Sequence, residues 1–191
     1  METQTSKKVS LRHQKEYFLI GTIQNATQFD LCSNEGLLCE LQIIHDNEWK
    51  RVNFEPAIQT QIGYSNPYLQ SVIWSRNFEF LFATNKQGNQ LPLGIIRVWL
   101  FDEDNKLNLV GYSKFAFPLK SGSYERKCPV WGLNSDYKST QMNWFLGNGP
   151  QLDDLGVLSD NSDDLQLLNT SRIGFVNIEL NVVKRFEDFN S

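Results

Sequence analysis

The stretch that most constrains the fold is residues 94–118, which read as two β-strands joined by a charged turn. Apolar residues alternate in the first strand and predict one wholly apolar face, made by Ile96, Val98 and Leu100. The opposite face also carries large side chains, namely Ile95, Arg97, Trp99 and Phe101. A strand that is apolar on both sides lies in the middle of a sheet or beneath a covering element. The stretch therefore predicts the centre of a β-sheet domain.

Short segments with the alternation of β-strands recur on both sides of this pair, with polar turns between them. They are residues 17–24, 37–44, 49–52, 57–63, 72–82, 124–131 and 172–184. Residues 136–146 break the alternation, and Asp136 and Gly147 suit the start and the end of a helix of about three turns. The pattern predicts an all-β fold, an antiparallel β-sandwich of about eight strands with one short late helix.

The length and composition suit a single domain with a full core, since 40% of the 191 residues are hydrophobic and 13% are aromatic. Residues 1–16 are polar and predict a mobile tail. Residues 17–189 predict the domain itself. Within it, residues 153–170 contain five aspartates and no basic residue, and we expect them to form a mobile acidic loop.

Charge, apolar runs and cysteine content argue against several classes of function. The net charge is −4, and the acidic residues 153–170 account for most of it, so the rest of the chain is nearly neutral. This balance predicts no nucleic-acid binding and little attraction to anionic lipid. No apolar run approaches the ~20 residues of a membrane span, and the N-terminus lacks the apolar segment of a signal peptide. Three cysteines without framework spacing suit a reducing cytoplasm.

The central pair, with its DxD-type turn and a second strand opening on Val110-Gly111, resembles the way many C2 domains are built. The order of further landmarks resembles the B9-domain family, C2-like proteins of the ciliary transition zone. The landmarks are Gly111-Tyr112, the CPVW segment at 128–131, the predicted helix, the GPQL segment at 149–152 and a final apolar strand. The resemblance covers residues 17–189, as in the short members of the family, and the GPQL segment favours the second of these.

The resemblance implies a C2-like fold and a non-enzymatic function. Members of the family are subunits of a complex at the base of the cilium, which supports cilium assembly and gates the entry of membrane proteins. The implied partners are other B9-domain proteins, which form a hetero-oligomer with this chain. The resemblance also allows a peripheral contact with a membrane. The resemblance implies no cofactor and no small-molecule substrate. It places the protein in the cytoplasm and cytoskeleton, at the basal body and transition zone.

Asp30, Asp102 and Asp104 are the candidate metal ligands, because C2 domains that bind calcium place carboxylates on adjacent loops. A calcium ion takes about six to eight oxygen ligands. Asn108 stands at the next carboxylate position, and leucines stand where a second acid of the first loop is expected. The set is too small, so we predict a solvated turn and no metal site. A calcium- or phospholipid-binding C2 module in membrane trafficking remains the alternative function.

Catalytic and zinc-binding patterns are missing from the sequence. It has no GxSxG, P-loop or GxGxxG motif, and its two histidines and three cysteines lack the spacing of zinc ligands. Cys39 and Cys128 are predicted to be small core residues. We therefore predict no catalytic residue, and an enzyme is the least favoured class.

Trp99 and Phe101 are the candidate partner-binding residues, because they point away from the apolar row of their strand. Two alternatives follow for these side chains. The late helix or a loop covers them, or they form an exposed apolar patch of the kind that marks a partner surface. In the second case Trp99 is the first candidate anchor.

Overall fold

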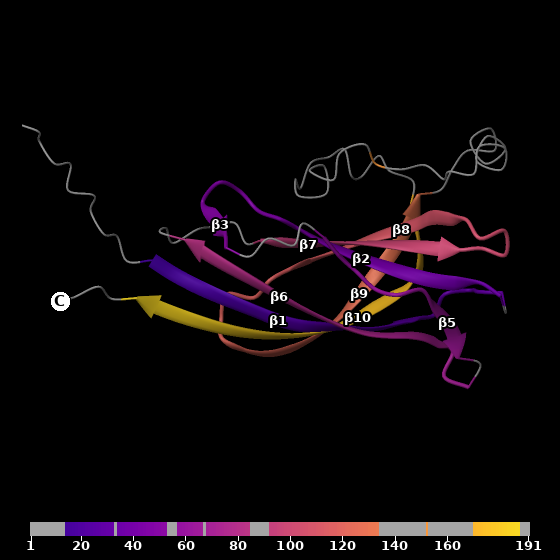
Figure 1. Ribbon diagram of the computed structural model, residues 1–191, viewed down its shortest axis with the longest axis horizontal. Coiled ribbons are helices and arrows are strands. Elements are labelled where there is room, and N and C mark those ends of the chain that lie inside the picture. Colours follow the sequence, from indigo (N-terminus) through magenta and orange to yellow (C-terminus); the bar gives the residue numbers. More distant parts are fainter. Residues whose placement is uncertain are drawn as a thin grey trace, which may run out of the picture.

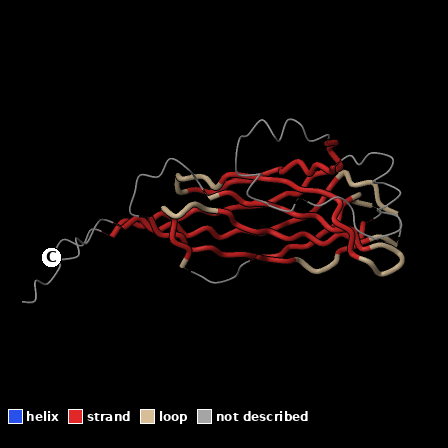
Figure 2. The backbone as a smooth tube through the Cα atoms, turned by 90° about the horizontal axis from the view of Figure 1, so that it is seen from above, coloured by secondary structure: helices blue, strands red, loops and turns tan. Residues whose placement is uncertain are grey.

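The computed structural model describes residues 14–32, 34–52, 57–66, 68–84, 92–133, 152 and 170–187. Ten β-strands run through this part of the chain, and none of the described residues is helical. In chain order the strands are β1 (Gln14–Thr27), β2 (Gly36–Ile44), β3 (Trp49–Arg51), β4 (Ala57–Gln59), β5 (Gly63–Asn66), β6 (Ser71–Thr84), β7 (Leu93–Phe101), β8 (Leu107–Ala116), β9 (Gly122–Leu133) and β10 (Thr170–Glu187). They run along the long axis of the molecule (Figure 2).

The strands form one antiparallel sheet that closes on itself as a flattened ring (Figure 1). The hydrogen-bonded order is β1, β10, β9, β8, β7, β2, β5 and β6, and β6 pairs with β1 to complete the ring. β3 extends from β6, and β4 pairs with β2. The predicted all-β class is therefore confirmed. The predicted β-sandwich is met only in part, because its two layers belong to one sheet that is closed like a barrel.

Short bridges at two corners turn two layers into this ring. One layer is built on β1, which pairs along its length with both β10 and β6. At one corner β8 meets β9 through the pair Tyr112 and Trp131. Pro129 of β9 has no N–H to donate to a neighbouring strand, which is consistent with so short a contact. At the other corner β5 pairs over two residues with each of β2 and β6.

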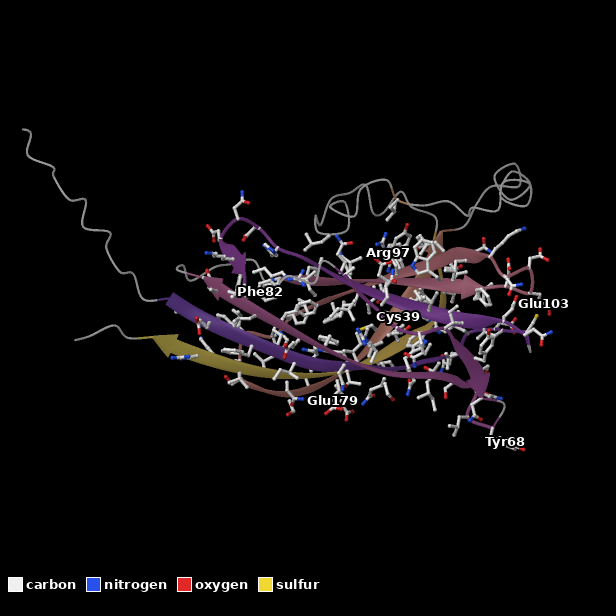
Figure 3. The ribbon with its side chains drawn as sticks, viewed as in Figure 1. Cys39, Tyr68, Phe82, Arg97, Glu103 and Glu179 are labelled. Atoms are coloured by element: carbon white, nitrogen blue, oxygen red, sulfur yellow. The ribbon has the colours of Figure 1, made fainter. Side chains whose placement is uncertain are left out.

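One large core fills the ring. Alternate residues of β6 point into it, and the ring centroids of Phe78, Phe80 and Phe82 follow one another at 5.5 and 6.3 Å. The thiols of Cys39 and Cys128 lie in the same core, as predicted, and Figure 3 shows Cys39 between the layers. Burial raises the pKa of both thiols, to about 12 for Cys128, so both are neutral small core residues at ordinary pH.

Several boundaries differ from the sequence predictions. β1 begins at Gln14, so residues 14–16, assigned to the tail, pair with β10. Residues 63–66 form β5, where we predicted the end of a strand and the start of a loop. β10 already includes Thr170, the last residue of the predicted acidic loop. The predicted helix at 136–146, residues 1–13 of the tail and residues 153–169 of the acidic loop lie outside the described residues.

Candidate functional site

The outer face of β7 carries a second apolar cluster, separate from the core inside the ring. Ile95, Leu109 and Tyr112 are buried at its centre. The half-buried side chains that pack around them are Ile44, Leu93, Trp99, Trp131 and Leu152. We call these eight residues the outer cluster. It exists because β7 is apolar on both faces, so the strand contributes to two apolar groups at once.

Trp99 lies in the outer cluster between Leu38 of β2 and Leu109 of β8, its neighbours in the sheet register. Its indole Nε1 is buried and has no hydrogen-bond partner among the described residues. Phe101, at the end of β7, is also half-buried. Both predicted partner-binding residues are thus neither fully covered nor fully exposed.

Leu152 shows that the chain between β9 and β10 reaches the outer cluster. Its backbone N–H donates a hydrogen bond to Oη of Tyr112 over 2.8 Å. Its side chain packs against the cluster. Leu152 belongs to the GPQL segment, so this motif has a structural use: it contributes an apolar side chain to the outer face of the ring.

A charged pair crosses the same outer face beside Trp99. Nη2 of Arg97 donates a hydrogen bond to Oε1 of Glu40, which stands opposite it on β2. The side chain of Glu40 is 8% exposed and that of Arg97 is 27% exposed. A carboxylate as buried as this one depends on its partner, because an unpaired buried charge is costly. Arg97 therefore supports the sheet from its outer side (Figure 3).

The turn between β7 and β8 uses Asp102 to hold its own backbone. Oδ1 of Asp102 accepts a hydrogen bond from the backbone N–H of Lys106, and Oδ2 accepts one from Nδ2 of Asn108, both over 2.8 Å. The bond from Lys106 is the main reason that the pKa of Asp102 is lowered, and the bond from Asn108 adds to it. Asn105 takes the left-handed conformation that such turns favour, with φ at 63°. Both oxygens of Asp102 thus have a role in the turn.

The other two candidate ligands, Asp30 and Asp104, lie near the same end of the ring. Among the described residues, no group of three or more His, Cys, Asp or Glu side chains could hold a metal ion. The end is acidic nonetheless, because Asp30, Glu35 and Glu103 all lie close enough to act on Cys32. Nδ2 of Asn34 donates a hydrogen bond to Oε1 of Glu103 over 3.4 Å and so ties the two loops together. Glu103 projects there in Figure 3.

The pKa of the Cys32 thiol reflects the negative charge at this end of the ring. Its pKa is raised, above all by the neighbouring charge of Glu35 and also by those of Glu103 and Asp30. The same carboxylates disfavour the binding of an anion beside Cys32. Cys32 is exposed and is one of three free cysteines.

Comparison with known proteins identifies the family. The family model described as "Ciliary basal body-associated, B9 protein" matches residues 17–183. This chain belongs to the B9 family. The predicted resemblance is thereby confirmed, as is the preference for the second short member, since the curated relatives are named B9 domain-containing protein 2.

The relatives of this B9 chain come from several vertebrates. The protein from Bos taurus is 29% identical over 174 residues, which cover 91% of this chain and 95% of the relative. The Homo sapiens protein is 28% identical, covering 89% and 94%, and the Danio rerio protein is 25% identical, covering 91% and 95%. A solved structure, a C2 domain of plant Extended Synaptotagmin 1, aligns with a TM-score of 0.43 and 10% identity, covering 91% of this chain and 96% of that domain.

The B9 chain also carries a cavity that sequence reasoning missed. It has a volume of about 450 Å³ and opens where the β1–β2 loop meets the ends of β2, β7 and β10. We call it the end cavity. Leu100, the last residue of the predicted apolar row, lines this cavity, so it is half-buried where Ile96 and Val98 are fully buried. No sequence signal marks the cavity, because its lining comes from five separate segments.

The opposite outer face of the B9 protein, formed by β1, β6 and β10, carries exposed apolar side chains. Ile20 is 48% exposed and Val183 is 54% exposed. Phe18 stands in register with Val183 on one side and Leu81 on the other. We call these four residues the β1 patch. Figure 3 shows Glu179 of β10 and Arg97 of β7 on opposite sides of the molecule. The face of β1, β6 and β10 is therefore distinct from the face that carries the outer cluster.

No helix within the described ranges is long and apolar enough to cross a membrane.

Proposed function

We propose that this B9 protein is a non-enzymatic adaptor subunit of a complex at the transition zone of the cilium. It binds other B9-domain proteins there, supports cilium assembly and helps to gate the entry of membrane proteins. The match of the ciliary basal body-associated family over residues 17–183 carries the proposal. We expect it to localise to the basal body and transition zone, in the cytoplasm and in association with the cytoskeleton.

The outer cluster supports this proposal, because apolar and aromatic side chains outside a core are the usual anchors of an interface. Trp99 is the first anchor and Phe101 the second. The indole Nε1 of Trp99 is a buried donor without a described partner.

The alternative function, a calcium- or phospholipid-binding module, has weaker support. Asp102 engages both of its carboxylate oxygens within its own turn. A calcium ion at Asp102 would compete with these hydrogen bonds for the lone pairs of its carboxylate.

The decisive experiment is co-expression with the other B9-domain proteins of the same cell, followed by size-exclusion chromatography. We expect the chain to self-associate when it is made alone, because its apolar anchors are only half-buried. We expect a discrete, soluble complex when the relatives are present. A monodisperse monomer that elutes unchanged beside its relatives contradicts the adaptor function.

A pair of variants on opposite faces locates the docking surface. Trp99→Ala is expected to weaken the complex by more than ~2 kcal/mol, about thirtyfold in Kd. Its matched control is the double variant Ile20→Ser with Val183→Ser in the β1 patch, which is expected to leave the affinity unchanged. The thermal unfolding of each free variant separates lost affinity from lost stability. A lower melting temperature with unchanged affinity for Trp99→Ala contradicts its role as an anchor.

A further inference from the structure

We propose that the end cavity binds one bulky apolar side chain of a partner polypeptide, whose main-chain amide lies between Asp30 and Arg172. The inference deepens the adaptor function and rests on it for the class of partner. It concerns a different surface from the outer cluster, because the cavity opens at the end of the ring.

The cavity has the size and lining of a ligand site. Its volume of about 450 Å³ falls within the range of roughly 300–1,000 Å³ typical of such pockets. Six apolar side chains line it, namely Phe29, Leu31, Leu37, Leu100, Val110 and Ile173. Three polar side chains complete the lining, namely Gln28, Asp30 and Arg172. An apolar chamber with a few polar groups selects a ligand that is mostly apolar and polar at one place.

Two close approaches to glycine hold the walls in place. A Cβ atom at position 174 would lie 2.5 Å from the ring of Phe29, so the ring packs directly on the backbone of Gly174. A Cβ atom at position 111 would lie 2.8 Å from Cδ1 of Ile173. Both distances are shorter than a real Cβ atom tolerates, so neither position accepts another residue unless its neighbour shifts. The two lining residues therefore rest on the backbone of β8 and β10 and cannot easily fold into the chamber.

The part of the β1–β2 loop that directly follows the lining residues 28–31 is held by its own hydrogen bonds. The backbone N–H of Cys32 donates to Oε2 of Glu35 over 2.7 Å, and the backbone N–H of Glu35 donates to the carbonyl oxygen of Cys32 over 3.2 Å. The bond between Asn34 and Glu103 ties the loop to the β7–β8 turn. A loop held in this way is preorganised, so binding requires little further ordering.

The charges of the cavity lining favour an amide over an ion. Asp30 supplies a hydrogen-bond acceptor and Arg172 supplies donors, and both side chains are exposed. The guanidinium of Arg172 lies 4.9 Å from the centre of the Phe175 ring, a contact that favours a defined position. A main-chain amide offers one N–H and one C=O and matches both groups. A fatty-acid carboxylate would be attracted by Arg172 but repelled by Asp30 and by the acidic loops beside it.

Titration followed by methyl NMR tests the chemistry of the site directly. The probe is N-acetyl-leucine-N′-methylamide, with N-acetyl-alanine-N′-methylamide as its matched control and octanoate as the lipid-like competitor. We expect saturable shifts of the methyl groups of Leu37, Leu100, Val110 and Ile173 with the leucine amide. The alanine amide should bind about fiftyfold more weakly, because it buries three fewer carbon atoms. No saturable shift, or tighter binding of octanoate, overturns the proposal.

Two conservative variants test the polar contacts. Asp30→Asn and Arg172→Gln are each expected to weaken the leucine amide about fivefold, since each loses a charge-assisted hydrogen bond. Their melting temperatures should match that of the natural chain, because both side chains are exposed. Unchanged affinity in both variants overturns the placement of the amide between these residues.

A filled cavity then tests whether the partner uses the site. Leu100→Trp should abolish binding of the leucine amide and weaken the co-expressed complex about tenfold. Val110→Phe serves as a second filling variant if the first lowers the melting temperature, and Lys106→Ala is the control at the same end. If the amide is lost but the complex persists, the partner assignment is overturned while the adaptor function stands. If the natural chain forms no complex, the adaptor function fails and the amide titration alone decides the cavity.

Discussion

The inner and the outer face of β7 both bury apolar side chains, but they do so in different ways. On the inner face Ile96 and Val98 are fully buried in the one large core of the ring. On the outer face Ile95 is equally buried, yet it belongs to a small cluster whose outer members are half-exposed. The inner face is closed by the other strands of the ring. The outer face is closed in part by Leu152, which arrives from a distant part of the chain.

The two faces of β7 thus bury apolar side chains in two different groups, the core inside the ring and the outer cluster. The inner row holds the ring together, because its side chains touch strands from both layers. The outer cluster is apolar beyond the needs of that core. The ion pair of Arg97 and Glu40 lies beside it, and the indole Nε1 of Trp99 within it has no hydrogen-bond partner among the described residues. Surplus apolar surface of this kind is a feature of proteins that bind partners.

The largest expected effect is on the inner face. Ile96→Ala should lower the free energy of unfolding by about 2–5 kcal/mol, because it leaves a cavity in a closely packed core. Leu100→Ala, in the same row but half-buried at the end cavity, should cost about 1–2 kcal/mol. Urea unfolding followed by fluorescence gives both values. Equal losses for the two variants would contradict the difference in burial along the row.

The ion pair on the outer face comes next. Arg97→Ala should cost about 2–4 kcal/mol, because it leaves the carboxylate of Glu40 buried without its partner. The double variant Arg97→Met with Glu40→Gln should be more stable than Arg97→Ala, since it removes both charges. A thermodynamic cycle built on Arg97→Met, Glu40→Gln and their double variant measures the coupling. Additive losses would show that the pair contributes nothing of its own.

The aromatic side chain of the outer cluster should matter less to the fold. Trp99→Ala is expected to lower the stability of the free monomer by about 1–2 kcal/mol, because the side chain is half-buried and its surroundings can relax. Differential scanning calorimetry of the free chain measures the effect. A loss as large as that of Ile96→Ala would make the outer cluster part of the essential core and remove the contrast between the two faces.

The turn at the end of β7 gives a smaller, pH-dependent effect. The pKa of Asp102 is lowered in the folded state, so its carboxylate stabilises the fold above its unfolded pKa of 3.8, and this contribution is lost as the pH falls through the lower folded value. Asp102→Asn should therefore melt below the natural chain at pH 7, with the gap closing in acid.

Asp104→Asn is the matched control for this change, because the carboxylate of Asp104 is exposed and lies 3.6 Å from Nζ of Lys106. Its melting temperature should not change at any pH. We also expect no calcium-dependent rise for the natural chain. A rise in calcium that Asp102→Asn abolishes would favour the alternative function, since a ligand of the native state must stabilise it.

The smallest effect is expected in the same turn. Lys106→Ala should change the stability by less than ~0.5 kcal/mol, because the turn uses the backbone N–H of Lys106 and its side chain is exposed. Thermal unfolding beside Ile96→Ala provides the check. Similar losses for these two variants would refute the assignment of buried row and exposed turn.

Much of this protein follows from its sequence alone. The alternation of apolar residues located most of the strands, and the central pair 94–118 corresponds to β7 and β8. The burial of Cys39 and Cys128 and the membership of the B9 family were also readable from the chain. These features depend on local periodicity or on short motifs, which each stretch of sequence carries by itself.

Other features were decided by the tertiary structure. The sheet closes through the single pair of Tyr112 and Trp131 and through the short β5, and neither leaves a periodic signal. The end cavity, the β1 patch and the contact of Leu152 with Tyr112 each join residues from distant segments. Alternation along a strand shows which residues share a face. Only the register and packing of remote strands determine what covers that face, and so which apolar side chains remain for a partner.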